Sequence, residues 1–395
     1  MSEATVVAAR PPWRILHVVE ASSGGVARHV VDLACEQRLM GHEVQVVYSP
    51  LRADDRFLAD LRDAGVTSVH AIAMQRQPSL SDFGAIRAIR RHIRRHGPFD
   101  IVHGHSSKGG ALARMASVGI ATLRVYTPHA MRTLDPTLAG GPRLVYGFIE
   151  LALARFCTDL FICTSKQELQ HAVSHGIPEA ICYVIRNRSS QRPRVSRQEQ
   201  RASLGIPDDV VVIAFVGRLE PQKAPLRALD IVARLSRTTT VPFQLLVVGD
   251  GSLKAEMETR IRDLGLGPYV TLVGNRRGID YIAAADALLN TSTYDTSPYV
   301  ISEAAQLGIP VVTTPVGDAA DMVSSGETGF VVKEGDTDEM VAALRRFIAD
   351  SDFRAVLTQT AQSRAGGFDA ASMAGQISEL YERGLIRKTS ARVWR

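Results

Sequence analysis

The feature that most constrains this chain is an alternation, from end to end, of short apolar segments with longer segments of helical periodicity. Such alternation is typical of parallel β-sheets covered by helices. The strands expected in the first half are Ile15–Val19, Val44–Tyr48, Ser68–Ile72, Ile101–His103, Arg124–Thr127, Leu160–Cys163 and Tyr183–Ile185. Those expected in the second half are Val211–Val216, Gln244–Val248, Val270–Val273, Ala287–Leu289, Val311–Thr313 and Phe330–Val332.

Between the two series the composition changes, because Asn187 to Arg201 has almost no apolar residues and reads as a linker leading into a short helix. At 395 residues, 45% of them hydrophobic, the chain is long enough for two domains that each bury a core. We therefore predict an α/β protein with two Rossmann-like domains facing a central cleft, residues 1–188 and 205–370. Residues 371–395 are expected to form a C-terminal helix or tail that packs back toward the N-terminal domain.

Composition excludes several classes of protein. Cys35, Cys157, Cys163 and Cys182 form no CxxC pair and have no histidine at metal-ligand spacing, which favours free thiols in a reducing cytosol. No apolar run is long enough to span a membrane, and Met1–Pro12 does not resemble a signal peptide. We expect a cytoplasmic protein.

The segment Phe83–Phe99 has five arginines and no acidic residue. The helical spacing of Phe83, Ile86, Ile89 and Ile93 predicts a helix with one buried edge and a basic face. That face is either simply solvated or attracted to an anionic surface, a membrane or a polyphosphate. The basic tail of residues 387–395 would assist attachment to a membrane. Nucleic acid is not an expected partner, because no aromatic residues interleave with the arginines.

Two glycine-rich turns follow predicted strands. Gly24-Gly25 stands directly before a predicted helix, so a ligand could approach the backbone there and the helix N-terminus would favour an anion. The alternative is that the two glycines only form a tight turn. The second half opens with VGRLEPQK, in which Arg218 and Lys223 lie at the mouth of a parallel sheet. Two cations there suit a diphosphate, the alternative being ordinary surface charge.

The segment Tyr294–Val316 contains Asp295 and Glu303, two carboxylates placed to accept hydrogen bonds from sugar and ribose hydroxyls. Pro298 suits a first helical position, so the backbone amides around Ser297, Tyr299 and Val300 are expected to form a helix N-terminus that binds phosphate.

Together these segments resemble family 4 of the retaining GT-B glycosyltransferases, which assemble bacterial polysaccharides, lipopolysaccharides and glycolipids. The matching segments span about residues 14 to 365 in the family's order: SSGGVARHV, HGHSSKGGALAR, VYTPHA, VGRLEPQK, VVGDGSL, the Asp295/Glu303 segment and PVVTTPVGDAADMV…GETGFVV. By this resemblance Gly25 approaches the donor phosphates, Arg218 and Lys223 bind the diphosphate, and His129 contacts the transferred sugar. Glu303 binds the ribose and Asp295 the sugar hydroxyls. The full set expected at the donor site adds Gly24, Gly249, Gly274, Asn275, Ser297, Tyr299 and Val300.

The resemblance implies transfer of a hexose or N-acetylhexosamine, with retention, from a nucleotide sugar to a lipid-linked or polysaccharide acceptor. It favours UDP as the nucleotide and leaves GDP and ADP open. Arg218, Lys223 and helix N-termini would stabilise the leaving diphosphate in place of a metal, so no cofactor is expected. The predicted location is the cytoplasm, with peripheral attachment to the inner face of the plasma membrane.

The chain departs from the family pattern at two places. Asp295 stands where the family usually has Glu, and Asn187-Arg188-Ser189-Ser190 replaces the usual Asn-Gly-hydrophobic-Asp. These departures leave open the alternative that the chain is a non-catalytic subunit that binds the donor. The fold alone also allows a second alternative, a nucleotide-sugar epimerase. Asp336-Thr337-Asp338 spells the metal-binding DxD of other glycosyltransferases, but a helix follows directly, so we interpret it as an N-cap with helix-dipole acids.

Overall fold

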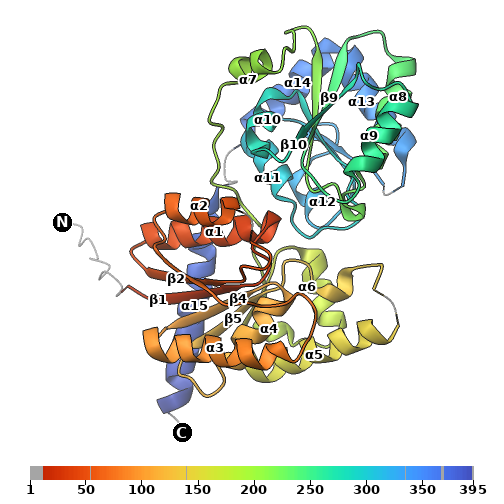
Figure 1. Ribbon diagram of the computed structural model, residues 1–395. Helices are drawn as coiled ribbons and strands as arrows, with labels where there is room; N and C mark the ends of the chain where they lie inside the picture. Colours follow the sequence, from red (N-terminus) through yellow and green to blue (C-terminus); the bar gives the residue numbers. More distant parts are fainter. Residues whose placement is uncertain (1–11, 54, 139, 334, 366–368, 394–395) are drawn as a thin grey trace, which may run out of the picture.

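The computed structural model describes residues 12–53, 55–138, 140–333, 335–365 and 369–393, with side chains up to residue 390. The segment interpreted above as lacking a signal peptide, Met1–Pro12, lies almost wholly outside the described residues. Figure 1 shows two α/β units, one above the other in the view, joined by the polar segment that precedes α7 (Arg197–Ser203).

The first unit is built on a parallel sheet with the order β3-β2-β1-β4-β5-β6-β7. Its strands are β1 Arg14–Val19, β2 Glu43–Tyr48, β3 Ser68–Ala71, β4 Ile101–His105, β5 Leu123–Thr127, β6 Leu160–Cys163 and β7 Cys182–Val184. Its helices are α1 Gly24–Leu39, α2 Asp55–Asp63, α3 Ser81–His96, α4 Ser107–Ala116, α5 Gly141–Cys157 and α6 Lys166–Ser174, with short 3-10 turns η1 Arg132–Leu134 and η2 Glu179–Ile181.

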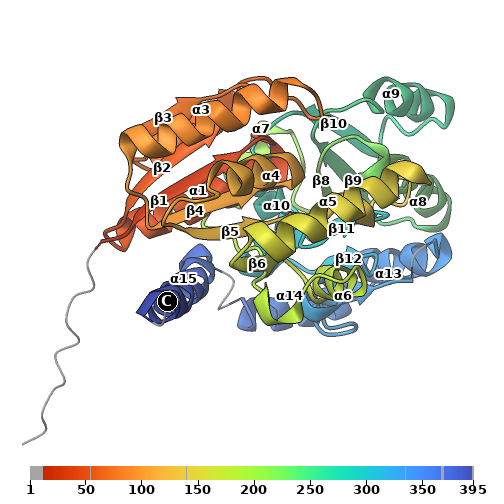
Figure 2. The ribbon, with the colours of Figure 1, turned by 90° about the horizontal axis from the view of Figure 1, so that it is seen from below.

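The helices of the first unit lie in two layers. Figures 1 and 2 show α1 and the C-terminal helix α15 (Ala370–Val393) on one face of the sheet, and α3, α4 and α5 on the other. Met373, Ile377 and Tyr381 of α15 are fully buried against Ile15 and Val125. The end of the chain thus completes the core of the first unit.

The second unit has a parallel sheet with the order β10-β9-β8-β11-β12-β13. Its strands are β8 Val211–Val216, β9 Phe243–Val248, β10 Val270–Gly274, β11 Ala287–Asn290, β12 Val311–Thr313 and β13 Gly329–Val331. Its helices, besides α7, are η3 Pro221–Lys223, α8 Pro225–Thr238, α9 Lys254–Asp263, α10 Gly278–Ala284, α11 Tyr299–Gln306, α12 Ala319–Met322, α13 Thr337–Ala349 and α14 Ser351–Ser363.

Every strand that the alternation predicts is present, with ends that differ by no more than two residues, so the α/β prediction with two Rossmann-like units is confirmed. One residue of the buried edge predicted for α3, Phe83, is not buried. Ile89 and Ile93 are buried, but the stripe continues through Ala85, and the side chain of Phe83 is 66% exposed. Phe83 lies beside the stripe in the first turn of α3, where the described residues leave most of it open to solvent.

Candidate functional site

A pocket between the units is lined by residues that follow β5 and β6 of the first sheet and β11 and β12 of the second. Both units line it, the first with Ala130 and Leu134, the second with Tyr294, Asp295 and further residues. The remaining lining residues are Gln167, Thr293, Thr296, Pro315 and Val316. Ligands of open α/β sheets bind at the carboxyl ends of the strands, so the pocket lies where the sequence predicts a site.

Three of the predicted polar groups lie together in the second unit. The Lys223 ammonium donates to the Asp295 carboxylate, and both side chains are mostly removed from water. Arg218 is exposed at the end of β8 and donates to Gln222 Oε1 over 3.0 Å, and Gln222 in turn donates to the carbonyl of Tyr294. This arrangement leaves the Arg218 guanidinium in solvent at the cleft, while Lys223 is held beside Asp295.

The glycines of the second unit have a packing role. A Cβ on Gly249, whose φ is +150°, would stand 1.9 Å from the Gly217 carbonyl oxygen, so only glycine allows the ends of β8 and β9 to meet. The Gly249 amide donates to the Gly274 carbonyl, and the carbonyl of the next residue, Asn275, accepts from Arg56 of the first unit over 3.0 Å. These glycines lie at the carboxyl edge of the second sheet, and their binding of the donor stays a prediction.

Helix α11 begins at Tyr299, and Pro298 is its N-cap residue rather than its first helical residue. Tyr299 reaches the first unit, where its ring lies 3.7 Å from the position of a Cβ on Gly25. One turn later the buried Glu303 accepts from Ser189 Oγ over 3.4 Å. Burial raises the pKa of the Glu303 carboxyl to about 7, against the opposing effect of the Arg28 guanidinium.

The segment in which the chain departs from the family pattern joins the two units. The Asn187 backbone amide donates to Ser297 Oγ over 3.1 Å, and its side-chain Nδ2 donates to the Ser297 carbonyl over 3.0 Å. Its Oδ1 is bonded to Nδ1 of His29 over 3.0 Å. Asn187 therefore holds Ser297, just before the N-terminus of α11, close to His29 of α1.

The turn that contains His129 has an unusual backbone. His129 and Ala130 have φ of +54° and +78°, a conformation that non-glycine residues adopt at a cost. The buried Glu168 carboxylate holds the turn, because it accepts from the amides of Ala130 (2.9 Å), Met131 (3.0 Å) and Thr164 (2.7 Å). Sequence reasoning missed Glu168, although the Ser165-x-x-Glu168 capping pattern that begins α6 signals it.

The DxD sequence is engaged in structural contacts. Asp336 is the N-cap of α13 and accepts from the Glu339 amide over 2.9 Å, which confirms the capping interpretation. Asp338 forms an ion pair with Arg234. Two groups whose nitrogens lie within 4.8 Å of one another could offer metal ligands instead: His17 with His103 and His105, and His29 with His105 and His129.

Comparison with protein families gives two matches that divide the chain as the two units do. Residues 23–187 match Glycosyltransferase Family 4, and residues 196–364 match Glycosyl transferases group 1.

Curated relatives are similar along most of the chain. The UDP-Gal:alpha-D-GlcNAc-diphosphoundecaprenol alpha-1,3-galactosyltransferase of Escherichia coli is 25% identical over 84% of this chain and 87% of its own length. The D-inositol 3-phosphate glycosyltransferase of Streptomyces avermitilis is 28% identical over 91% of this chain and 83% of its own. Among solved structures, Anabaena HepE in complex with UDP and glucose matches with a TM-score of 0.79 at 23% identity, over 94% of this chain and all of HepE.

Proposed function

The chain belongs to family 4 of the GT-B glycosyltransferases and is a retaining hexosyltransferase, and from this premise we propose that it transfers a hexose or N-acetylhexosamine from a UDP-sugar to a lipid-linked glycan acceptor. The epimerase and the non-catalytic subunit are not favoured, because the relatives are glycosyltransferases over most of their length.

One observation above all supports this proposal. Ala130, next to His129, and Asp295, paired with Lys223, line the same pocket from opposite units. A group transfer needs its donor and its acceptor held together, and a pocket shared by both sheet edges can do this. UDP is proposed as the nucleotide because the Escherichia coli relative is named for UDP-Gal and HepE was solved with UDP.

In the proposed reaction the bond from the anomeric carbon to the diphosphate breaks, and a bond to the acceptor oxygen forms on the same face. The acceptor proton passes to the departing phosphate oxygen. Arg218, Lys223 and the N-terminus of α11 would stabilise the charge that develops on the diphosphate. Family members are generally metal-independent, and we propose that this chain also needs no metal and no other cofactor.

The lipid-linked acceptor is supported by a helix beside the pocket. Leu134 of η1 lines the pocket, and η1 lies beside α5. Helix α5 exposes large apolar side chains to solvent: Leu144 76%, Val145 57%, Phe148 72%, Ile149 39% and Phe156 75%. Exposed apolar groups on this scale mark a binding surface, and a lipid chain entering the pocket would lie along them.

An anionic bilayer is the proposed surface for docking. Helices α3 and α5 flank α4 on one face of the first unit (Figure 2), and Arg87, Arg91, Arg94 and Arg95 of α3 are exposed there. Arg90 is not available, because it donates to the carbonyls of Ala116 and Val118. In the tail, Arg387 donates to Tyr183 Oη and Lys388 pairs with Asp159, while the side chains of residues 391–395 lie outside the described part. No helix in the described part of the chain is both long and apolar enough to cross a bilayer.

The test is turnover of radiolabelled UDP-hexoses with polyprenyl-diphosphate sugars, with inositol phosphate as the competing acceptor. Sugar transfer to the polyprenyl acceptor, giving UDP in equal amount, supports the proposal. Transfer to inositol phosphate alone overturns the acceptor assignment. Conversion of the donor to its epimer without an acceptor overturns the reaction.

A further inference from the structure

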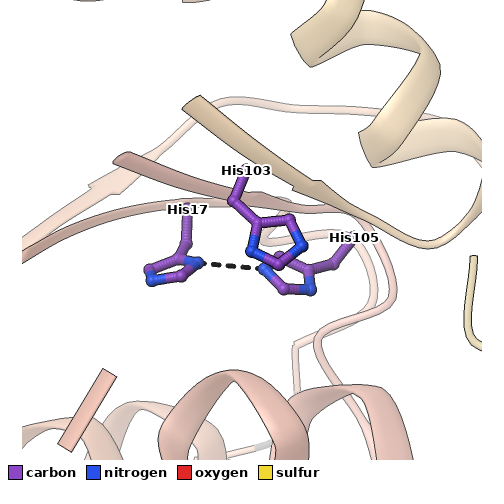
Figure 3. A group of neighbouring side chains, drawn as sticks. All are labelled: His17, His103 and His105. Carbon is purple, nitrogen blue, oxygen red and sulfur yellow. Dashed lines mark hydrogen bonds between the residues drawn. The ribbon is translucent and has the colours of Figure 1, made fainter. Parts of the chain in front are cut away.

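A row of buried histidines runs through the first unit toward the cleft. Figure 3 shows His17 of β1 beside His103 and His105 of β4, and all three side chains are 0% exposed. Strands β1 and β4 are neighbours, and His17 is paired in register with His103. His105 is the last residue of β4, so the row leads from the middle of the sheet to its carboxyl edge.

Hydrogen bonds connect part of this row to His129. His129 Nε2 is bonded to His105 Nδ1 over 3.2 Å, and His105 Nε2 to His17 Nδ1 over 2.9 Å. His17 Nε2 is bonded to Oε1 of Gln37, on α1, over 2.8 Å. We call these four residues, Gln37, His17, His105 and His129, the relay.

The orientation of the Gln37 amide gives the relay a direction. Its Nε2 donates to Tyr381 Oη over 3.5 Å, which leaves Oε1 facing His17. An amide oxygen only accepts, so His17 Nε2 must carry a proton.

Burial keeps these imidazoles uncharged. It lowers the pKa of His17 to about 4 and those of His105 and His129 well below the ordinary value. A neutral imidazole has one donor and one acceptor nitrogen. His17 Nδ1 therefore accepts from His105 Nε2, and His105 Nδ1 accepts from His129 Nε2.

We propose that Gln37, acting through His17 and His105, fixes the proton of His129 on Nε2 and leaves its Nδ1 as a hydrogen-bond acceptor in the cleft. No hydrogen bond from the described part of the chain reaches this Nδ1, and the His129 side chain is only partly buried. If the proposed function holds, the group that it accepts from is a hydroxyl of the transferred sugar. Gln37, His17 and His105 are then positioning residues.

His29 offers a second acceptor beside the first. The Asn187 amide is oriented by its bond to the Ser297 carbonyl, so its Oδ1 faces His29 Nδ1, which must carry the proton. His29 Nε2 is then a bare acceptor, buried and without a partner in the described structure. The His29 and His129 rings lie 4.5 Å apart between centroids. Two neutral acceptors side by side suit the hydroxyls of an uncharged sugar and disfavour a carboxylate or phosphate.

The same nitrogens are close enough to hold a metal, but their bonds favour the relay. His103, the third member of the group in Figure 3, is bonded through Nδ1 to Tyr381 Oη (2.6 Å) and through Nε2 to Thr127 Oγ1 (2.8 Å). A cation bound to His17, His103 and His105 would have to displace one of these bonds and the bond between His17 and His105. It would also bring charge into a fully buried site.

The proton positions can be measured on the free protein, without any substrate. In protein with ¹⁵N-labelled histidine, long-range ¹H–¹⁵N spectra at pH 7.5 distinguish the two neutral tautomers and the imidazolium. We expect His17, His105 and His129 in the Nε2–H form and His29 in the Nδ1–H form. A wild-type His129 with a proton on Nδ1, or an imidazolium, overturns the proposal whatever the enzyme's substrate proves to be.

The variant Gln37→Met tests whether Gln37 fixes the proton of His129 on Nε2. Gln37→Met removes the amide at similar size, so we expect His17, His105 and His129 to change to the Nδ1–H form. The control is Thr127→Val, a substitution of similar shape at an equally buried site, which removes a hydrogen bond of His103 and none of the three bonds of the relay. An unchanged His129 tautomer in Gln37→Met, or displacement of the His17 and His105 resonances by equimolar Zn²⁺, contradicts the relay.

Kinetics show whether the tautomer matters for donor use. With UDP-glucose, or the UDP-hexose found active in the turnover assay, Gln37→Met is expected to lower kcat/KM by about 3- to 10-fold, the scale of one hydrogen bond. Thr127→Val is expected to stay within about twofold, below that scale. A reversed His129 tautomer with unchanged kcat/KM would overturn the contact between His129 and the sugar while leaving the proton positions established.

Discussion

The carboxyl edges of the two sheets present different kinds of polar group to the space between the units. The edge of the second unit presents charges, Arg218 and the pair Lys223–Asp295, close to the surface. The edge of the first unit presents the histidines His29 and His129, which burial keeps neutral. Charged groups suit a diphosphate whose negative charge grows as its bond to the sugar breaks, whereas neutral acceptors suit the uncharged hydroxyls of the sugar. We propose that the cations of the second unit stabilise the leaving diphosphate, and that the two histidines of the first unit accept from hydroxyls of the sugar, which Asp295 of the second unit also contacts. The predictions below test these roles.

The largest effect is expected from the cations of the second unit. Arg218→Ala or Lys223→Ala should lower kcat/KM by about 10²- to 10³-fold, the scale for losing one group that stabilises developing charge. Thermal unfolding should be nearly unchanged for Arg218→Ala, because its side chain is exposed. Steady-state kinetics with a UDP-hexose check this. Near-normal turnover in either variant would contradict the proposal that Arg218 and Lys223 bind the diphosphate.

Helix α3 of the first unit has four exposed arginines, Arg87, Arg91, Arg94 and Arg95. Changing Arg91, Arg94 and Arg95 to Gln should weaken binding to vesicles with anionic lipid by about a hundredfold, at about 1 kcal/mol for each charge. The matched control changes Arg237, Arg262 and Arg345, three exposed arginines of the second unit, to Gln. Vesicle flotation at low and high salt measures both. Equal weakening by the two triple variants would show a general charge effect and no docking face.

The two carboxylates of the second unit are expected to act on different parts of the donor. Glu303→Ala should weaken UDP by roughly 10- to 100-fold, as expected for lost hydrogen bonds to a charged group. Asp295→Ala should leave UDP affinity within about threefold and weaken the whole UDP-sugar or its turnover. Calorimetric titration with UDP and with a UDP-hexose separates these effects. Equal loss of UDP affinity in both variants would contradict the roles given to them.

A smaller effect is expected from pH. The pKa of Glu303 is about 7 in the free protein, and hydroxyl donors from a ribose would stabilise the carboxylate and lower this pKa. Binding should therefore release about half a proton at pH 7, and UDP affinity should rise by about tenfold at most between pH 6 and 8. Titration in buffers of different ionisation enthalpy measures the released proton. Glu303→Gln should abolish the release, and persistence of the release in that variant would assign it to another group, such as Asp318.

No effect is expected from chelation. The charges of the second unit are proposed to replace a metal, and Asp336 and Asp338 are engaged with the Glu339 amide and with Arg234. Turnover in EDTA should equal turnover with added Mg²⁺ or Mn²⁺. Loss of activity in EDTA that Mg²⁺ restores would mean that Arg218 and Lys223 do not suffice for the leaving group.

Much of the site in the second unit could be predicted from sequence because it follows from local chain geometry. Arg218 and Lys223 are five residues apart just after a strand, and Asp295 and Glu303 are joined by one loop and one helix. Parallel strands bring such segments to one edge. The direct pairing of Lys223 with Asp295 was not predicted, because the two residues are 72 apart and their meeting depends on how η3 packs beside the loop after β11.

In the first unit a family resemblance predicted a role for His129, and the sequence did not show what surrounds it. Glu168 holds the His129 turn from α6, and Asn187 orients His29 from the segment after β7. No local pattern joins these residues to His129, since each contact spans a different pair of elements.

The sequence by itself determined the two sheets and their order along the chain, because the apolar periodicity of each segment decides whether it becomes strand or helix. Only the tertiary structure decided the protonation and partners of the site. A tautomer depends on what each ring nitrogen meets, and His129, His105, His17 and Gln37 meet only after β5, β4, β1 and α1 have packed together. Burial also decides whether a histidine or a carboxylate carries charge, and it is a property of the folded chain as a whole.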